Sequence, residues 1–141
     1  MDKAWGGSSG RLDEKHRLLI PARAREDFPA MTHLIPAPDN CLFLFSAPQF
    51  ARYRKRLMRA EPTNLPGIAY DRILNNRMVS QRLDRQGRIV VPAKLREYAS
   101  INRDVVVNWM ETRIEIWDTQ CWDDYVARYI DDYAKSSEGV R

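Results

Sequence analysis

The stretch LDRQGRIVVPAKLRE, residues 83–97, decides the fold because the chain contains a near copy of it. Seventy-one residues earlier stands LDEKHRLLIPARARE, residues 12–26, and seven of the fifteen aligned positions are identical. Most other positions keep their character, as where Leu18 corresponds to Ile89. A repeat of this kind predicts two copies of one supersecondary unit, each of which needs a partner to bury its apolar face.

Each copy begins with the pattern of a strand, a tight turn, a second strand and a short helix. In the first copy the apolar run at residues 17–20 is too short for a helix and predicts a strand. Pro21 suits the first position of the helix expected over residues 22–28, because its missing N–H is not needed there. The second copy predicts a strand over residues 88–91 and a helix over residues 92–99.

Both copies then continue into strands followed by a longer helix. In the first copy the pattern is a strong strand over residues 41–45, with Ser46 as the N-cap of a helix over residues 48–59. In the second copy a β-branched hairpin leads to a final helix that Asp118 or Thr119 caps. The repeat therefore spans more than its fifteen most similar residues.

The repeat also predicts the domain organisation, and the fold class is α+β. The expected segments are a first repeat over residues 4–60, a linker and connecting helix over 61–76, a second repeat over 77–134 and a disordered tail over 135–141. The first ten residues are rich in Gly and Ser, so we expect them to be mobile apart from Trp5.

Length and composition exclude several classes of protein. A chain of 141 residues suits one compact domain or two small intertwined halves. No run of eighteen apolar residues exists, and the amino terminus lacks the apolar middle of a signal peptide, which predicts a soluble cytoplasmic protein. Two cysteines, far apart in sequence, do not make a disulfide framework and are expected to be ordinary thiols.

Charge is unevenly distributed along the chain. Residues 1–110 contain 19 Lys and Arg against 11 Asp and Glu, whereas residues 111–141 contain 4 against 8. Basic residues are densest over residues 72–96, which contain seven Lys or Arg residues and a single acidic residue, Asp84. That density indicates a polyanionic partner, although charge alone favours a merely solvated basic face.

Each copy places an aspartate four positions before an arginine across the turn, Asp13 before Arg17 and Asp84 before Arg88. The chain reversal can bring the carboxylate and the guanidinium within pairing distance, which would fix the shape of the loop. A planar guanidinium suits phosphate oxygens and the edge of guanine, because its forked donors bind in a bidentate way. The duplicated Arg-bearing loops and the basic centre of the chain therefore make DNA binding the leading hypothesis.

Catalysis is the least favoured function. His16 and His33 have no spacing to Cys41 or Cys121 that suggests a catalytic triad or a metal site. The aspartates of the two turns could form a catalytic pair, but each has its own arginine, which favours a structural ion pair. We expect no catalytic residue, no metal, no cofactor and no small-molecule substrate.

The chain resembles the MraZ family of AbrB-like (SpoVT-AbrB) swapped-hairpin transcription regulators. The resemblance covers roughly residues 4–134 and is most specific in LDRQGRIVVPAKLREYASINRDVVVNWMETRIEIWD, residues 83–118, and CLFLFSAPQF, residues 41–50. It implies that the two copies interleave their strands into one pseudo-twofold β-structure flanked by helices. It also implies ring-like, nucleoid-associated homo-oligomers that bind repeated promoter boxes in double-stranded DNA and regulate, by repression, the cell-division and cell-wall gene cluster that contains the family's own gene.

The resemblance places the family's DNA-contacting arginines on Arg17 and Arg88 and its basic loop residue on Lys15. We expect Arg85, which follows the second aspartate, and Arg82 to add phosphate contacts. Three further residues would give the loops their shape: Asp13, Asp84 and Gly87. The first copy departs from the family pattern because His16 stands where the second copy has Gly87. A turn position with positive φ strains most residues, and His tolerates it better than most. The departure bears on the shape of the first loop, and on the DNA sequence preferred, more than on the fold.

An alternative function comes from a different class. AbrB-like folds also resemble the DNA-binding halves of antitoxins, so the chain could act mainly through a protein partner. The acidic carboxyl-terminal region would engage a basic partner through Asp123, Asp124, Asp131, Asp132 and Glu138. Co-purification of a partner, together with the identity of the neighbouring gene, discriminates between the two functions.

Overall fold

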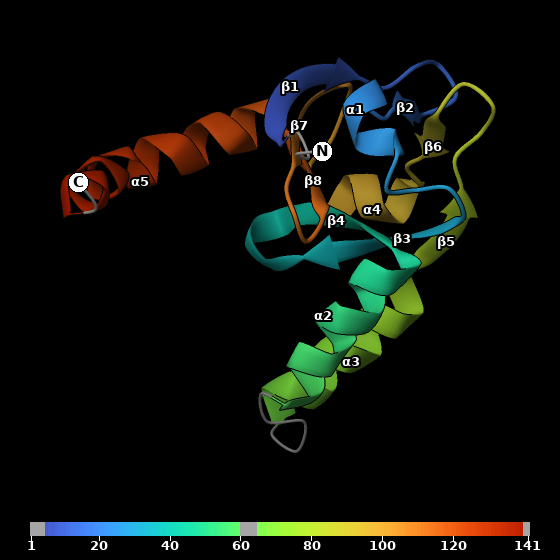
Figure 1. Cartoon of the computed structure of the whole chain (residues 1–141), viewed down its shortest axis with the longest axis horizontal. Coiled ribbons are helices and arrows are strands. Elements are labelled where there is room, and N and C mark those ends of the chain that lie inside the picture. Colours follow the sequence, from blue (N-terminus) through green and yellow to red (C-terminus); the bar gives the residue numbers. More distant parts are fainter. Residues whose placement is uncertain (1–4, 60–64, 140–141) are drawn as a thin grey trace.

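Each copy contributes four strands and two helices to the structure, a computed structural model that describes residues 5–59 and 65–139 (Figure 1). The elements of the first copy are β1 (Gly6–Arg11), β2 (Arg17–Leu19), α1 (Ala22–Arg25), β3 (Met31–Ala37), β4 (Cys41–Ser46) and α2 (Ala47–Arg59), with the short 3-10 turn η1 (Pro38–Asn40) between β3 and β4. The connecting helix is α3 (Leu65–Arg77). The elements of the second copy are β5 (Val79–Arg82), β6 (Arg88–Val90), α4 (Ala93–Tyr98), β7 (Asp104–Trp109), β8 (Ile114–Asp118) and α5 (Thr119–Gly139).

The two copies interleave their strands, as the resemblance implied. The larger sheet has the order β1-β7-β8-β4-β3-β5, and β2 pairs with β6 in a separate ribbon, all antiparallel. The first strand of each copy therefore pairs with the third strand of the other copy. The counterparts in the two copies are β1 and β5, β2 and β6, β3 and β7, and β4 and β8. If each strand of the larger sheet is replaced by its counterpart and the sheet is read from the opposite edge, the order is unchanged. This connectivity fits a pseudo-twofold relation, and the symmetry itself stays a prediction.

The central strand β4 is buried along its whole length and alternates between two apolar clusters. Leu42 and Leu44 belong to the larger cluster, which takes side chains from both copies. Phe43 and Phe45 face the second cluster, against which α2, α3 and α5 pack. Because successive side chains of a strand point to opposite faces, β4 ties the two clusters together.

Both predicted helix caps are confirmed. The Ser46 backbone N–H donates to Gln49 Oε1 at 3.0 Å, and the Gln49 N–H donates to Ser46 Oγ at 3.3 Å, which is a reciprocal capping box at the start of α2. At the start of α5 the cap is Asp118, whose Oδ2 accepts from the Cys121 N–H at 3.0 Å. Pro21 and Pro92 have extended ψ angles of 138° and 158° and stand at the N-caps of α1 and α4, one residue before the first helical position predicted for Pro21.

The amino-terminal segment is a strand, so the expected mobility of the first ten residues is wrong from Gly6 onward. β1 pairs with β7 over six positions, from Gly6 opposite Trp109 to Arg11 opposite Asp104. Gly10 reflects close packing, because a Cβ at this position would lie only 3.2 Å from Leu18. Residues 1–4 lie outside the described part of the chain.

Two helices are longer than their sequence patterns indicate. The pattern predicts the connecting helix α3 over residues 68–75, and the helix runs over Leu65–Arg77. The pattern predicts that the last helix α5 ends at Tyr133, and it runs to Gly139, so residues 135–139, expected in a disordered tail, are helical. Residues 60–64, 140 and 141 lie outside the described residues.

Candidate nucleic-acid interface

The loop between β1 and β2 is organised by one carboxylate. Asp13 Oδ1 accepts hydrogen bonds from the backbone N–H groups of Lys15 and Arg17, each at 2.9 Å. Asp13 Oδ2 accepts from Arg17 Nε at 2.7 Å. These bonds, the one from the Arg17 backbone first, hold the pKa of Asp13 below its ordinary value of 3.8. The predicted Asp–Arg pair therefore exists in the first loop.

The loop between β5 and β6 repeats this arrangement bond for bond. Asp84 Oδ1 accepts from the backbone N–H groups of Gln86 and Arg88 at 2.9 Å, and Asp84 Oδ2 accepts from Arg88 Nε at 2.8 Å. The pKa of Asp84 is lowered for the same reason, with the Arg88 backbone bond the largest cause. The two loops thus share one internal frame, and the residues between Asp and Arg differ.

His16 adopts the backbone conformation of its glycine counterpart. Its φ is 60°, and that of Gly87 is 82°. In both loops the residue at this position donates its backbone N–H to the carbonyl of the aspartate at 2.9 Å. The first loop therefore keeps the frame of the second despite its departure from the family pattern.

The two loops are also joined to each other. The His16 carbonyl accepts from the Val91 N–H, and the Gly87 carbonyl accepts from the Ile20 N–H, both at 2.9 Å. The β2–β6 ribbon continues this pairing. In addition, Arg88 Nη1 lies 3.8 Å from Asp13 Oδ2, across the two copies. Because each loop fixes the other, their spacing on the surface is set by the fold.

The predicted DNA-contacting residues separate into two environments. Lys15, Arg82 and Arg85 are exposed on or beside the loops. Arg17 and Arg88 are half-buried, with side chains 29% and 25% exposed, and both direct Nε to an aspartate. Contact between DNA and any of these five residues stays a prediction, whereas the loop-shaping bonds of Asp13 and Asp84 are part of the structure.

Sequence reasoning missed a residue that supports the second loop. Arg25 donates from Nε to the Ile20 carbonyl at 2.7 Å, and its side chain lies where a Cβ on Gly87 would stand. Gly87 is therefore fixed by both a positive φ and a close neighbour. The signal was available, because Arg25 and Arg96 are identical in the repeat and Arg96 likewise donates to the Val91 carbonyl.

A second missed residue has no counterpart in the other copy. Gln81 donates from Nε2 to the Val90 carbonyl and accepts from the Val90 N–H at Oε1, both at 2.8 Å, so its side chain extends the edge of β6. Gly10 stands at the equivalent place in β1, seventy-one residues earlier, and has no side chain to do this. The two hairpins therefore differ at their edges, although the loops match.

The described residues contain no cluster of three or more His, Cys, Asp or Glu side chains that could hold a metal ion. None of the helices in residues 5–59 and 65–139 is both long and apolar enough to cross a membrane. Cys41 is buried, and this burial raises the pKa of its thiol well above the ordinary value.

Comparison with known proteins agrees with the paired loops and the interleaved strands. A family model described as "MraZ protein, putative antitoxin-like" matches residues 6–72 and 77–139. The protein named transcriptional regulator MraZ from Salinispora arenicola is 39% identical over 136 residues, covering 96% of this chain and 95% of its own. Proteins of the same name from Micrococcus luteus and Moorella thermoacetica are both 36% identical, covering 96% and 90% of this chain and 94% and 89% of theirs. A match over nearly the whole length, across both copies of the repeat, means that the chain belongs to the MraZ family, a family of regulators and not of enzymes.

Proposed function

We propose that this chain is a DNA-binding transcription regulator that contacts double-stranded DNA through the loops between β1 and β2 and between β5 and β6. One observation carries the proposal: two loops with identical Asp–Arg frames are locked together by reciprocal backbone bonds between His16 and Val91 and between Gly87 and Ile20. Such a pair presents its variable, exposed residues at a fixed spacing. A fixed spacing suits a ligand with a regular repeat, such as a duplex. The relatives named above are called transcriptional regulators.

The basic residues on and beside the loops would make two kinds of contact with DNA. Lys15, Arg82 and Arg85 are exposed cations suited to phosphate oxygens, and phosphate contacts set position and register without specifying sequence. The guanidinium groups of Arg17 and Arg88 have five N–H donors each, and the aspartates engage the one on Nε. The remaining donors would be held in a fixed orientation toward base edges or phosphates.

Assembly would supply the affinity that one protomer lacks. Two small loops make few contacts, so a single protomer binds DNA weakly. A ring-like homo-oligomer that presents many loops to repeated promoter boxes gains affinity through effective concentration. By resemblance to the family, these boxes lie upstream of the cell-division and cell-wall gene cluster that contains the chain's own gene, and binding there would repress it. The protein would then act in the cytoplasm, in association with the nucleoid.

The test is fluorescence anisotropy with a duplex from upstream of the chain's own gene and a shuffled duplex of the same composition. We expect the native duplex to bind more tightly, and the affinity for both to fall steeply between about 50 and 200 mM salt, since phosphate contacts release counterions. Equal affinity for both duplexes, or binding insensitive to salt, would contradict the proposal.

A second candidate is an antitoxin-type module that acts through a protein partner. The family description and the acids of α5 both favour it, since Asp123, Asp124, Asp131 and Asp132 are exposed. Purification of the untagged complex from the native cell, with identification of a product of the adjacent gene at stoichiometric amounts, would support this module. Its absence, together with specific DNA binding, would favour the regulator.

A further inference from the structure

We infer that an aromatic hollow between α2 and α5 receives the projecting end of α5 from a second copy of this chain. The contact runs from head to tail, because the hollow and the projecting helix end are different parts of each protomer. This inference rests on the homo-oligomer of the proposed function and gives that assembly a specific contact. It does not involve the DNA-binding loops.

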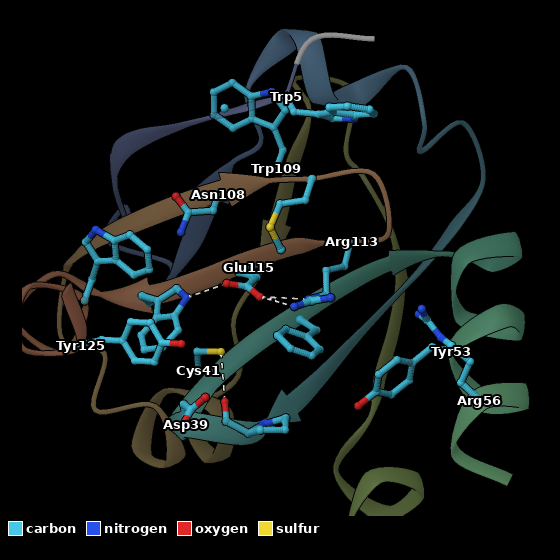
Figure 2. A pocket seen from close by; sticks show the side chains of 16 residues that line it. Trp5, Asp39, Cys41, Tyr53, Arg56, Asn108, Trp109, Arg113, Glu115 and Tyr125 are labelled. Carbon is cyan, nitrogen blue, oxygen red and sulfur yellow. Dashed lines mark hydrogen bonds and ion pairs between the residues drawn. The ribbon is translucent and has the colours of Figure 1, made fainter. Parts of the chain in front are cut away.

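The aromatic hollow has a volume of about 840 Å³ and lies on the face of the sheet formed by β4, β7 and β8 (Figure 2). All four tryptophans of the chain line it: Trp5, Trp109, Trp117 and Trp122. Phe43, Tyr53 and Tyr125 complete its rings. Trp5 is 56% exposed, whereas Phe43 and Trp117 are buried, so only part of this ring surface faces solvent in the isolated protomer.

The polar groups at the floor of the hollow are already bonded to one another. Arg113 Nη2 donates to Glu115 Oε2 at 2.7 Å, and Trp117 Nε1 donates to Glu115 Oε1 at 3.0 Å. The Arg113 guanidinium also lies 4.2 Å from the ring centre of Phe43. No buried side-chain nitrogen or oxygen in the described residues lacks a partner. The hollow therefore offers ring surface more than unsatisfied polar groups, which suits an apolar helix face better than a polar small molecule.

One side of the hollow continues into a basic wall on α2, formed by Arg52, Lys55 and Arg56. These three residues line a second hollow of about 550 Å³, and Arg56 also lines the aromatic hollow. Glu111 at the β7–β8 turn is the acid among the residues that line this second hollow. The sequence of α2 contains five basic residues and no acid, so the wall attracts an acidic partner.

The helix α5 has the complementary features. Trp122 and Tyr125 pack against Trp117, and the same stripe continues at helical spacing into Tyr129 and Ile130. The last two are 43% and 48% exposed, because α5 projects beyond the sheet (Figure 1). This apolar stripe on α5 is covered by the sheet at one end only, so its exposed end needs another protein surface to cover it.

Charges on α5 complete the match with the basic wall. The acids Asp131 and Asp132 follow directly after the exposed apolar pair, and all residues from 127 to 136 are exposed. Pairing α5 with a second α5 would bring these acids together and leave the hollow open. Packing Tyr129 and Ile130 into the hollow, with the acids toward the basic wall, satisfies both surfaces. A head-to-tail contact of this type closes into a ring when its rotation closes.

The experiment uses two charge-reversed variants of the full chain. The first is Asp131→Lys with Asp132→Lys on α5, and the second is Arg52→Glu with Lys55→Glu on α2. We expect each variant alone to lose assembly by light scattering and native mass spectrometry, while its circular dichroism stays native. An equimolar mixture should assemble again in alternation, because each reversed surface then meets its complement. Glu26→Lys with Glu97→Lys, on the exposed ends of α1 and α4, is the control of equal charge change and should assemble normally.

Tryptophan emission provides a second measurement, because every tryptophan lines the hollow. Dilution of the wild-type oligomer should shift the emission to the red as the hollow opens, and the single variants should show the shifted emission at all concentrations. Wild-type assembly by either variant alone, or failure of the mixture to assemble, would overturn the inference. A wild-type chain that stays monomeric would overturn it as well. Failure of the DNA-binding function would appear separately, as equal anisotropy with native and shuffled duplexes.

Discussion

His16 and Gly87 adopt the same left-handed backbone conformation at equivalent positions of the two loops, with φ values of 60° and 82°. Of the two positions, only that of Gly87 requires glycine. His16 is exposed, whereas the side chain of Arg25 lies where a Cβ on Gly87 would stand. The two positions share a conformation and differ in their tolerance of a side chain.

Substitutions at these two positions should therefore have unequal effects. Gly87→Ala should destabilise the protein by about 1–3 kcal/mol, since it adds backbone strain and displaces Arg25. His16→Gly should leave the stability within about 1 kcal/mol of wild type, because relief of strain offsets the added freedom of the unfolded chain. Urea denaturation of both variants measures the difference. Equal losses of stability would mean that Arg25 does not restrict Gly87.

Removing the loop carboxylates separates loop shape from net charge. Asp13→Asn and Asp84→Asn each make the protein more positive, so simple electrostatics predicts tighter binding to any DNA. If the Asp–Arg hydrogen bonds give the loops their shape, the substitutions should instead weaken binding to the specific duplex, because the Arg17 and Arg88 side chains lose their charged partners. We expect anisotropy to show weaker binding to the native duplex with unchanged or tighter binding to the shuffled one. Tighter binding to both would refute the role of the frame.

Stability should depend on pH through His33. Burial lowers the pKa of His33 below its ordinary value of 6.5, and Nδ1 lies 2.8 Å from Ser80 Oγ where β3 pairs with β5. The folded state thus favours the neutral ring. The contribution of His33 to the free energy of unfolding is therefore complete above pH 6.5 and is lost as the pH falls through the lowered pKa. The free energy of unfolding, measured from pH 8 to 5, should decline less in His33→Gln than in wild type. Parallel declines in the two proteins would contradict this prediction.

Gln81 should stabilise the second hairpin selectively. Gln81→Met keeps the length of the side chain and removes both hydrogen bonds to Val90, which we expect to cost about 1–2 kcal/mol. Hydrogen exchange should accelerate at the Val90 amide. The Leu19 amide, at the equivalent position of β2, serves as an internal reference because Gly10 supplies no equivalent bond. Unchanged exchange at Val90 would show that the side chain does not protect the edge of β6.

The repeat made the local structure predictable. Each Asp–Arg pair spans four residues, so its geometry follows from the turn alone, and the box formed by Ser46 and Gln49 is equally local. The exchange of β1 and β5 between copies depends on partners about 50 to 100 residues away, and only the resemblance to a family indicated it. Composition was misleading at the amino terminus, because the glycines there allow close packing against β7.

The candidate site was predictable in its residues and less so in their environments. Arg17 and Lys15 have similar charge in the sequence, but hydrogen bonds to Asp13 hold the arginine half-buried and leave the lysine exposed. Nothing in the sequence indicated the role of Gln81, because its side chain bonds to the backbone N–H and carbonyl of Val90 and not to a side chain. The projecting part of α5 could not be predicted, since a stripe of aromatic residues does not show where the sheet beneath it ends.

The most direct test of the central claim compares two double variants on the native duplex over a salt series. Lys15→Ala with Arg85→Ala removes one exposed cation from each loop, and Arg72→Ala with Arg77→Ala removes two exposed cations from α3. We predict that the loop variant binds more weakly, with a salt slope lower by about 1 for each phosphate that it no longer neutralises, while the control keeps the wild-type affinity and slope. If the loop variant retains both and the control loses them, the loops are not the DNA-binding surface.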